Sequence, residues 1–399
     1  MVVDPLLPGL VLFTALIIAI GVLMRILKQP YVLAYIIVGI LLGPSGFQLT
    51  DESLVSSLGG IGIILLLFFI GTEVSLHRLL SNWRIAIVGT FFQIAISVAL
   101  VWLVGLLFNW SLEQSILFGF VISLSSTALV VKILQEWDEL NTKVGQNIMG
   151  VLLVQDLAVI PMFIILGYFG GSSAGGGNVI IQSILGIAFL GILVWLTSKG
   201  GIKLPSIKTI NLDHDTGIFA AFLVCFGLAL FTSLFGLSTA LGAFVAGILV
   251  SNARATKWFY MHLNPFRVIL VAAFFIYIGA IINLAFLMQN IVIISLLVVA
   301  VFLTNTFVNA AVFRFLGEDW EESLYSGALL SQIGEFSFVL AAFGLEIGII
   351  QNFGFQIISI VIAITLLLSP FWIHLMKHFT HADARKLKYR YVPTFIVSK

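Results

Sequence analysis

Residues 145–169 have the sequence GQNIMGVLLVQDLAVIPMFIILGYF, and this stretch decides the fold. It is an apolar run long enough to cross a lipid bilayer as a helix, which takes about 20 residues. One acid, Asp156, lies near its middle, beside Gln155. Because a carboxylate at mid-bilayer costs at least ~2.5–3.5 kcal/mol, this residue needs a structural or functional reason.

The composition of the whole chain is that of a membrane protein. Of its 399 residues, 60% are hydrophobic and only 9% are charged, whereas soluble domains carry about 25% charged residues. A chain this poor in charge cannot cover its own surface in water, which excludes the soluble enzymes. The single cysteine, Cys225, lies inside an apolar run and indicates helix packing rather than a disulfide. The membrane part has no basic run that could bind nucleic acid.

Apolar segments follow one another along the chain, and each predicts a membrane-spanning helix. They lie near Leu7–Met24, Tyr31–Leu42, Gly59–Ser75, Ile85–Phe108, Ser115–Val131, Gly145–Phe169, Ile180–Leu196, Thr216–Phe235, Leu237–Val250, Val268–Leu287, Ile291–Phe313, Ser323–Leu345 and Phe355–Met376. The expected fold class is therefore an all-α polytopic membrane protein with about thirteen transmembrane helices.

The basic residues test this topology through their distribution over the loops. All 19 Lys and Arg fall in the loops after odd-numbered segments or after the last segment, and none falls in the even-numbered loops. Loops rich in Lys and Arg face the cytoplasm. We therefore expect a multi-pass protein of the inner (plasma) membrane, with its N-terminus outside and its C-terminus inside. Residues 1–376 are the expected membrane domain, and residues 377–399 are a basic cytoplasmic tail that suits anionic membrane lipids.

Asp156 suits the exchange of a monovalent cation for a proton. Burial in a low-dielectric environment favours the neutral, protonated form of a carboxyl group, and an arriving cation favours the charged form. A carboxylate that holds either a cation or a proton, never both, is a minimal exchanger. The adjacent Gln155 could offer its side-chain carbonyl to the ion, hydrogen-bond Asp156 or bond a neighbouring helix.

Two segments contain polar interruptions. The fifth carries SLSST at residues 123–127, and the twelfth carries SQIGEF at residues 331–336. These hydroxyls either bond back within an ordinary helix or mark an unwound break, whose carbonyls and half-helix ends lie beside the ion. We expect breaks, with Ser125, Ser126 and Thr127 contributing to the cation and proton site. Interrupted segments at corresponding places in two halves are typical of inverted repeats.

Three further polar residues are expected to support the site. Glu335 could bind a cation or a proton, but we expect it to satisfy the free backbone donors of a broken helix. Glu73, at the cytoplasmic end of the third segment, is expected at an interface or along an inner funnel. Asn305, in the eleventh segment, is expected to form helix–helix hydrogen bonds.

Several motifs in the same order resemble the cation:proton antiporter-2 family, and within it the potassium-efflux (Kef-type) branch. They are GILLGP at 39–44, LFFIGTE at 67–73, SLSSTA at 123–128, VLLVQDLAVIP at 151–161, LSTALGAFVAG at 237–247, PFR at 265–267 with Phe274 and Phe275, and GEF at 334–336.

The resemblance implies an inverted-repeat, sodium/proton-antiporter-like fold with two crossed broken helices in the fifth and twelfth segments. It implies core helices near 54–169 and 263–376 that move against dimerisation helices near 1–42 and 177–260, in a homodimer. It also implies that Asp156 binds the ion and exchanges the proton. No covalently bound cofactor is implied, since K⁺ or Na⁺ and H⁺ are what is transported. The residue pair Gln155–Asp156 resembles the pair found at these positions in the potassium-handling branch.

Two departures from the family pattern matter. Many relatives carry a Lys where this chain has Asn305, and without that ammonium a proton is expected on cation-free Asp156. This predicts an electroneutral exchange of one cation for one proton. Kef-type proteins also continue into a regulatory domain, whereas this sequence stops after its tail. Either the sequence is truncated, or a separate cytoplasmic subunit regulates it, or regulation is absent. A sodium-coupled organic-anion symporter and a monovalent cation channel are the alternative functions.

Overall fold

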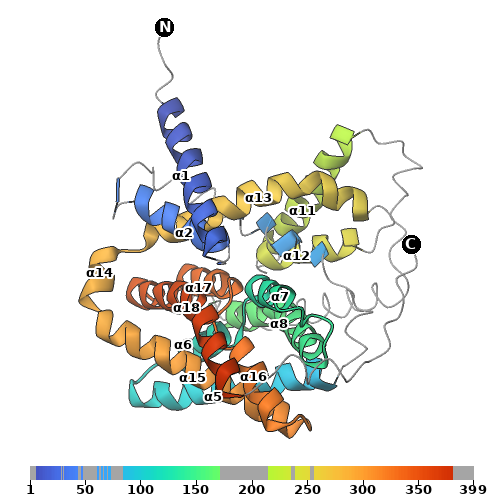
Figure 1. Ribbon diagram of the computed structural model, residues 1–399. Helices are drawn as coiled ribbons and strands as arrows, with labels where there is room; N and C mark the ends of the chain where they lie inside the picture. The colour runs from blue at the N-terminus through green and yellow to red at the C-terminus, as the bar shows by residue number, and fades with distance from the viewer. Residues whose placement is uncertain are drawn as a thin grey trace. The chain divides into compact units, whose positions relative to one another are not determined.

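A computed structural model describes residues 6–27, 29, 31–43, 46–47, 61–62, 64–65, 67–69, 71–72, 84–170, 214–234, 239–251 and 256–380. Within these ranges the chain is helical and forms no strand (Figure 1), which confirms the all-α fold class. The helices are α1 (Leu6–Ile26), α2 (Tyr31–Leu42), η1 (Arg84–Gly89, a π-helix), α5 (Thr90–Leu107), α6 (Leu112–Ser123), α7 (Thr127–Glu136), α8 (Lys143–Gly170), α11 (His214–Leu234), α12 (Thr239–Ser251), α13 (Thr256–Ile281), α14 (Leu284–Gln289), α15 (Ile291–Phe315), α16 (Trp320–Leu329), α17 (Phe336–Glu346) and α18 (Asn352–Phe379).

The described residues include helical stretches that are long and apolar enough to cross a bilayer. They are Arg84–Leu107, Leu112–Glu136, Lys143–Phe169, Ile291–Phe315 and Asn352–Phe379. Shorter apolar helices, among them Tyr31–Leu42 and Phe336–Glu346, correspond to further expected segments. The seventh expected segment, 180–196, lies outside the described residues, and only part of the third, 59–75, lies within them.

The chain divides into two compact units. One consists of Met1–Ser75, Leu157–Met288 and Ala342–Gln356, and we call it the companion unit. The other consists of Leu76–Asp156, Gln289–Ala341 and Ile357–Lys399, and we call it the site unit, because it contains every predicted site residue that the structure describes.

In the companion unit, α2 packs closely against α13 (Figure 1). A Cβ at Gly39 would lie 2.2 Å from the Ile276 carbonyl oxygen, and one at Gly279 would lie 2.1 Å from the Ile36 carbonyl oxygen. Any side chain at either glycine would therefore push the two helices apart. Close approach through small residues is a common way for helices to associate in membranes.

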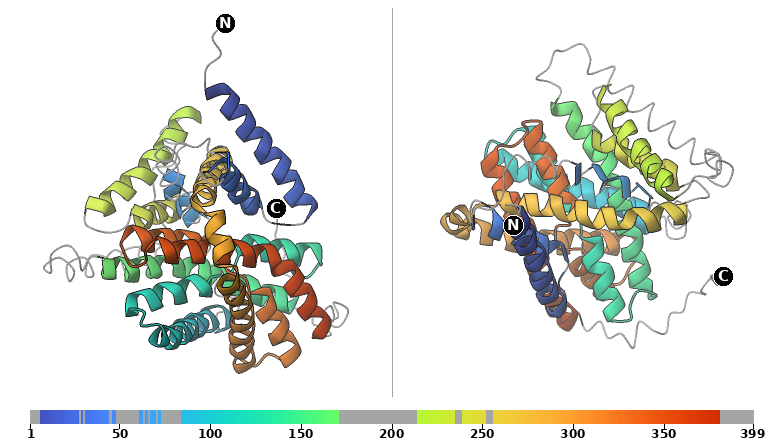
Figure 2. Two further views of the ribbon diagram at one scale, coloured as in Figure 1. Left: turned by 90° about the vertical axis from the view of Figure 1, so that its left-hand side faces the viewer. Right: turned by 90° about the horizontal axis from the view of Figure 1, so that it is seen from above.

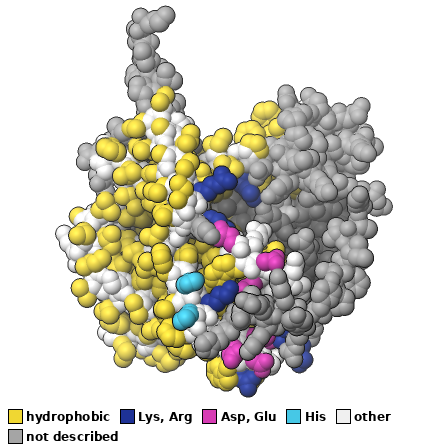
Figure 3. Space-filling view, in the orientation of Figure 1, with side chains coloured by type: hydrophobic (Ala, Val, Ile, Leu, Met, Phe, Trp, Pro, Cys, Tyr) yellow, Lys and Arg dark blue, Asp and Glu magenta, His cyan; other side chains and the backbone are white. Residues whose placement is uncertain are grey.

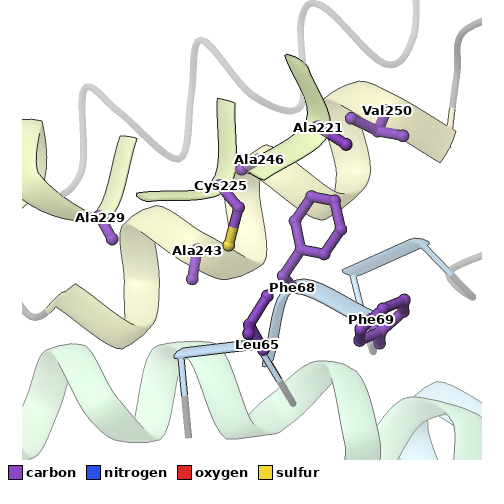
Figure 4. Close-up of a cluster of buried hydrophobic side chains, with 9 residues drawn as sticks. All are labelled: Leu65, Phe68, Phe69, Ala221, Cys225, Ala229, Ala243, Ala246 and Val250. Atoms are coloured by element: carbon purple, nitrogen blue, oxygen red, sulfur yellow. The ribbon is translucent and has the colours of Figure 1, made fainter. Parts of the chain in front are cut away.

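A second contact in the companion unit involves Cys225. Figure 4 shows it on α11 among Ala243 and Ala246 of α12 and the Phe68 ring. The thiol is buried and free, and its neighbours are apolar. This confirms the prediction that Cys225 packs helices together.

In the site unit, α5 packs against α6 and α15 packs against α16 (Figure 2). The end of α6 and the start of α7 are separated by residues 124–126, and the end of α16 and the start of α17 by residues 330–335. Both polar interruptions that the sequence shows are thus breaks between two half-helices.

The surface of the described helices is rich in large apolar side chains. Leu107 is 80% exposed, and Val292 and Phe371 are each 71% exposed. Figure 3 shows hydrophobic side chains over most of the described surface on one face. In water such exposure would be unfavourable, so these side chains are suited to contact with lipid.

Candidate functional site

The two breaks cross each other inside the site unit. The Gly334 backbone N–H donates to the Leu124 carbonyl oxygen at 2.7 Å. The Ser125 hydroxyl donates to the Leu330 carbonyl oxygen at 2.9 Å. Each break therefore satisfies backbone groups that the other has freed, as unwound backbone at membrane depth requires.

Glycine is required where the two backbone segments cross. A Cβ at Gly334 would lie 2.6 Å from the Ser125 carbonyl carbon and 2.9 Å from the Ser126 nitrogen. These are backbone atoms, which cannot swing away as the end of a side chain can. The glycine in the SQIGEF motif therefore allows the two backbones to approach each other.

The start of α7 is built as a helix cap. Ser126 is extended, with φ −77° and ψ 110°, and its hydroxyl accepts a hydrogen bond from the Leu129 N–H. Hydroxyl residues favour this position because they satisfy backbone donors that have no partner within the helix. The half-helix α7 thus begins at the crossing with the positive end of its dipole there.

Two acidic side chains meet this end of α7. The Thr127 hydroxyl donates to Asp156 Oδ2 at 3.0 Å. The Glu335 carboxylate accepts hydrogen bonds from the Ser126 hydroxyl, the Ala128 N–H and its own backbone N–H. Glu335 thus occupies backbone donors at both breaks. Asp156 and Glu335 are both only partly buried.

Asn305 connects the two broken helices. Its Nδ2 donates to the Ile122 carbonyl oxygen at 2.8 Å and to the Ser331 carbonyl oxygen at 3.1 Å. Its Oδ1 is buried and has no hydrogen-bond partner within the described part of the chain. The predicted helix–helix bonding is therefore present, with one neutral side chain holding both breaks.

Gln155 is fully buried, and its amide bonds to the first break. Its Oε1 accepts from the Ser125 N–H at 3.0 Å, and its Nε2 donates to the Ser123 carbonyl oxygen at 3.1 Å. The Nε2 also donates to Gln93 Oε1 at 3.0 Å, and Gln93 Nε2 donates to the Ser123 carbonyl oxygen at 2.8 Å. We call Gln93 and Gln155 the amide clamp. In this geometry the Gln155 amide bonds to a neighbouring helix, one of the three roles that the sequence left open.

Sequence reasoning missed Gln93. The available signal was weak: a single glutamine in a predicted span, on the same helix face as Thr90 and Ser97. The structure buries all three of these side chains.

The structure brings together at the crossing all the predicted site residues that it describes. They are Ser125, Ser126, Thr127, Gln155, Asp156, Asn305 and Glu335. Glu73 lies outside the described residues.

Comparison with known proteins places the chain in a family. The family model described as "Sodium/hydrogen exchanger, transmembrane" matches residues 12–376. The chain belongs to the sodium/hydrogen exchanger family. It is therefore a multi-pass membrane protein of the cation/proton antiporter type, a transporter rather than an enzyme.

Two relatives and one solved structure are similar to this chain. "Iron transporter MagA" from Paramagnetospirillum magneticum is 35% identical over 90% of this chain and 82% of its own length. "K(+) efflux antiporter 5" from Arabidopsis thaliana is 29% identical, covering 88% of this chain but 63% of the plant protein, so the chain spans less than two thirds of that relative. The sodium proton antiporter MjNhaP1 from Methanocaldococcus jannaschii shares the fold, with a TM-score of 0.65 at 20% identity over 96% of this chain and 99% of MjNhaP1.

Two groups of charged residues in this chain form ion pairs that were not predicted from the sequence. Lys143 pairs with Glu318, which also accepts from Asn147 Nδ2 at 3.1 Å. Lys377 pairs with the buried Glu139 at 2.6 Å. Each pair joins the end of a helix to a loop that is far away in the sequence, within the site unit. A buried carboxylate such as Glu139 needs such a partner, because an unpaired buried charge is strongly destabilising.

The Glu139–Lys377 pair has two further contacts, one to each partner. The Tyr325 hydroxyl donates to Glu139 Oε2 at 2.6 Å. The Lys377 ammonium lies 3.9 Å from the centre of the Trp137 ring, a favourable cation–π distance. These contacts tie the loop after α7, helix α16 and the end of α18 together.

Proposed function

We propose that the protein exchanges one monovalent cation, K⁺ in preference to Na⁺, for one proton by alternating access at Asp156. The observation that carries this proposal is the Asp156–Thr127 hydrogen bond at the crossing of two broken helices. It puts a partly buried carboxylate beside unwound backbone and a hydroxyl, which are oxygen ligands suited to a small cation.

The exchange follows from competition for one carboxylate. In a low-dielectric environment the charged form of Asp156 is costly without a cation, so loss of the cation favours protonation. An arriving cation restores the charged form and releases the proton. The Ser125–Thr127 break offers carbonyl and hydroxyl oxygens for the rest of the shell. Gln155 stays a predicted ligand, although its bonds to Ser125 and Ser123 support a role in holding the break.

The neutral Asn305 supports a one-for-one exchange. Its amide bridges both breaks through hydrogen bonds and brings no positive charge to the crossing. An ammonium there could pair with cation-free Asp156 and take the place of the proton. With an amide, only the cation or the proton balances the carboxylate, so each turnover moves no net charge.

The preference for K⁺ has support from the names of relatives. Several matching plant relatives are named K(+) efflux antiporters. MagA is named an iron transporter, and MjNhaP1 is named a sodium proton antiporter. Within the described residues, no group of three or more His, Cys, Asp or Glu comes together. Asp156 has Thr127 and the unwound backbone as neutral oxygen neighbours, and Glu335 is occupied by donors of the breaks, a set that suits a monovalent cation better than iron.

We also propose a homodimer in the inner membrane with the N-terminus outside, and the expected division into core and dimerisation helices. The pairs Lys143–Glu318 and Lys377–Glu139 support this orientation. They join residues of the loops after the fifth and eleventh segments and of the start of the tail. In the expected topology these three regions all lie on the same side of the membrane. A separate cytoplasmic regulatory subunit and anionic lipids are the further partners that we propose.

The test is transport by the purified protein in liposomes that contain a pH-sensitive dye. A pulse of K⁺ outside should drive protons out, with a smaller response to Na⁺ and none to Fe²⁺. Clamping the membrane potential at zero or at an applied voltage should leave the rate unchanged, because no net charge moves. If neither K⁺ nor Na⁺ moves protons, the antiporter proposal is wrong. Cation flux without proton movement would favour a channel.

A further inference from the structure

Helix α5 carries a buried polar stripe formed by Thr90, Gln93 and Ser97. Thr90 and Gln93 are each 1% exposed and Ser97 is fully buried. Their hydrogen bonding differs. Thr90 reaches the Val151 carbonyl oxygen at 3.5 Å, and the Ser97 hydroxyl has no partner among the described residues. Gln93 uses both ends of its amide at the first break.

The contacts of Gln93 fix the orientation of the Gln155 amide. Gln155 Nε2 has two protons and two acceptors, Gln93 Oε1 and the Ser123 carbonyl oxygen. Its Oε1 has one donor, the Ser125 N–H. Turning this amide over would set its oxygen against two oxygens and its NH₂ against an N–H, so all three contacts would become repulsive.

The amide clamp holds the backbone that leads into the ion site. Both clamp residues donate to the Ser123 carbonyl oxygen, which ends α6. Gln155 also holds the Ser125 N–H, two residues before Thr127. Because Gln155 adjoins Asp156 on α8, the clamp fixes the break relative to the carboxylate.

We propose that Gln93 is a positioning residue for cation binding. This role rests on the exchange function proposed above. Through Gln155 and through its own bond to the Ser123 carbonyl oxygen, Gln93 keeps the Ser125–Thr127 oxygens at a fixed separation from Asp156. Preorganised ligands bind a cation more tightly than ligands that must be ordered on binding. The proton requires less, since it binds Asp156 directly and Thr127 contacts the carboxylate without help from the clamp. Loss of Gln93 should therefore weaken cation binding more than proton binding.

The test compares cation and proton affinity in dye-loaded liposomes. Gln93→Met keeps the length of the side chain but removes its hydrogen bonds. We expect the KM for K⁺ to rise about tenfold, as loss of a hydrogen-bonded anchor worth about 1.4 kcal/mol would produce. We expect the pH of half-maximal rate, measured with K⁺ at the same multiple of each variant's KM, to move by less than about 0.3 unit, since a tenfold change in proton affinity would move it by about one unit.

Matched controls separate positioning from folding. Thr90→Val and Ser97→Ala change the same buried face of α5 outside the clamp, and both should keep the wild-type KM. Gln93→Glu retains an acceptor for Gln155 Nε2 and should have a KM between those of the wild type and Gln93→Met. The Gln93→Met, Gln155→Met double variant should raise the KM by less than the product of the two single effects, because Gln93 and Gln155 bond each other and share the Ser123 carbonyl oxygen.

Three results would overturn the role of Gln93: a wild-type KM in folded Gln93→Met, an equal rise in KM in Ser97→Ala, or additive effects in the double variant. Each of these requires a wild-type protein that exchanges K⁺ for protons. A wild-type protein without exchange would instead overturn the proposed function itself, so the two failures are distinguishable.

Discussion

The first and second breaks cross each other, yet the glutamines associated with them differ. At the first break, every polar atom of the Gln155 amide is bonded, to Ser125, Ser123 and Gln93. At the second break, Gln332 is equally buried, but neither its Oε1 nor its Nε2 has a partner among the described residues. The first break is therefore held rigidly, whereas the second contains unused hydrogen-bonding capacity. The rigid break is the one whose next helix begins at Thr127, beside Asp156.

Gly334→Val should have the largest effect, because it breaks the crossing on which the comparison depends. The added side chain would meet the Ser125 backbone, and we expect a loss of about 3 kcal/mol or more in stability. Thermal unfolding of purified protein, followed by tryptophan fluorescence, measures this loss. Gly227→Ala is the control, since its Cβ would meet nothing within 4 Å. Equal melting temperatures for the two variants would contradict the close crossing.

Gln155→Met tests the rigidity of the first break. It leaves the Ser123 carbonyl oxygen, the Ser125 N–H and Gln93 Oε1 without their bonds to Gln155. We expect a cost of about 2 kcal/mol, since unpaired buried groups lose about 1–3 kcal/mol. The melting temperature should fall clearly and K⁺-driven proton movement should weaken. A variant as stable and as active as wild type would show that the clamp is unimportant.

Asn305→Leu should be milder, although it affects both breaks at once. Two hydrogen bonds, to Ile122 and Ser331, are lost. Hydrogen bonds between membrane helices are worth about 0.6 kcal/mol on average, so we expect a loss of about 1 kcal/mol. Asn309→Leu, one turn further along α15, removes a single bond to the Asn305 carbonyl oxygen and should cost about half as much. The melting temperatures of the two variants test this order. A larger loss of stability in Asn309→Leu than in Asn305→Leu would contradict it.

Gln332→Met should have the smallest effect. Removing a buried amide without partners gives up no hydrogen bond within the described part of the chain, and the new side chain has a similar volume. We expect a stability within about 0.5 kcal/mol of wild type, or a slight gain. A loss as large as that of Gln155→Met would mean that Gln332 has a partner, such as a buried water, and that the two breaks are alike.

Much of this site could be predicted because its residues are anomalous in an apolar chain. A run of hydroxyls at 123–127 and the SQIGEF sequence at 331–336 contrast with their surroundings, and both are breaks. Asp156 is conspicuous for the same reason. Gln93 is not, because one glutamine in a span predicts no particular partner. The partner of Gln155 became clear only from the fold.

Contacts between distant residues could not be predicted. Glu139 and Lys377 are 238 positions apart, and each has the sequence surroundings of an ordinary loop residue. Only the packing of α16 and α18 beside the loop after α7 brings them together. The sequence did predict that Lys377, at the start of the tail, lies on the same side as the loop after the fifth segment, because charge distribution sets orientation without specifying pairs.

The central claim is that the Asp156 carboxylate carries either the cation or the proton. Asp156→Asn keeps the size of the side chain and its capacity to accept from Thr127, but it cannot ionise. In dye-loaded liposomes we expect a folded Asp156→Asn protein to move no protons in response to K⁺ or Na⁺. Asp319→Asn, which neutralises an exposed acid before α16, should retain wild-type exchange. Cation-driven proton movement that survives in Asp156→Asn would contradict the account.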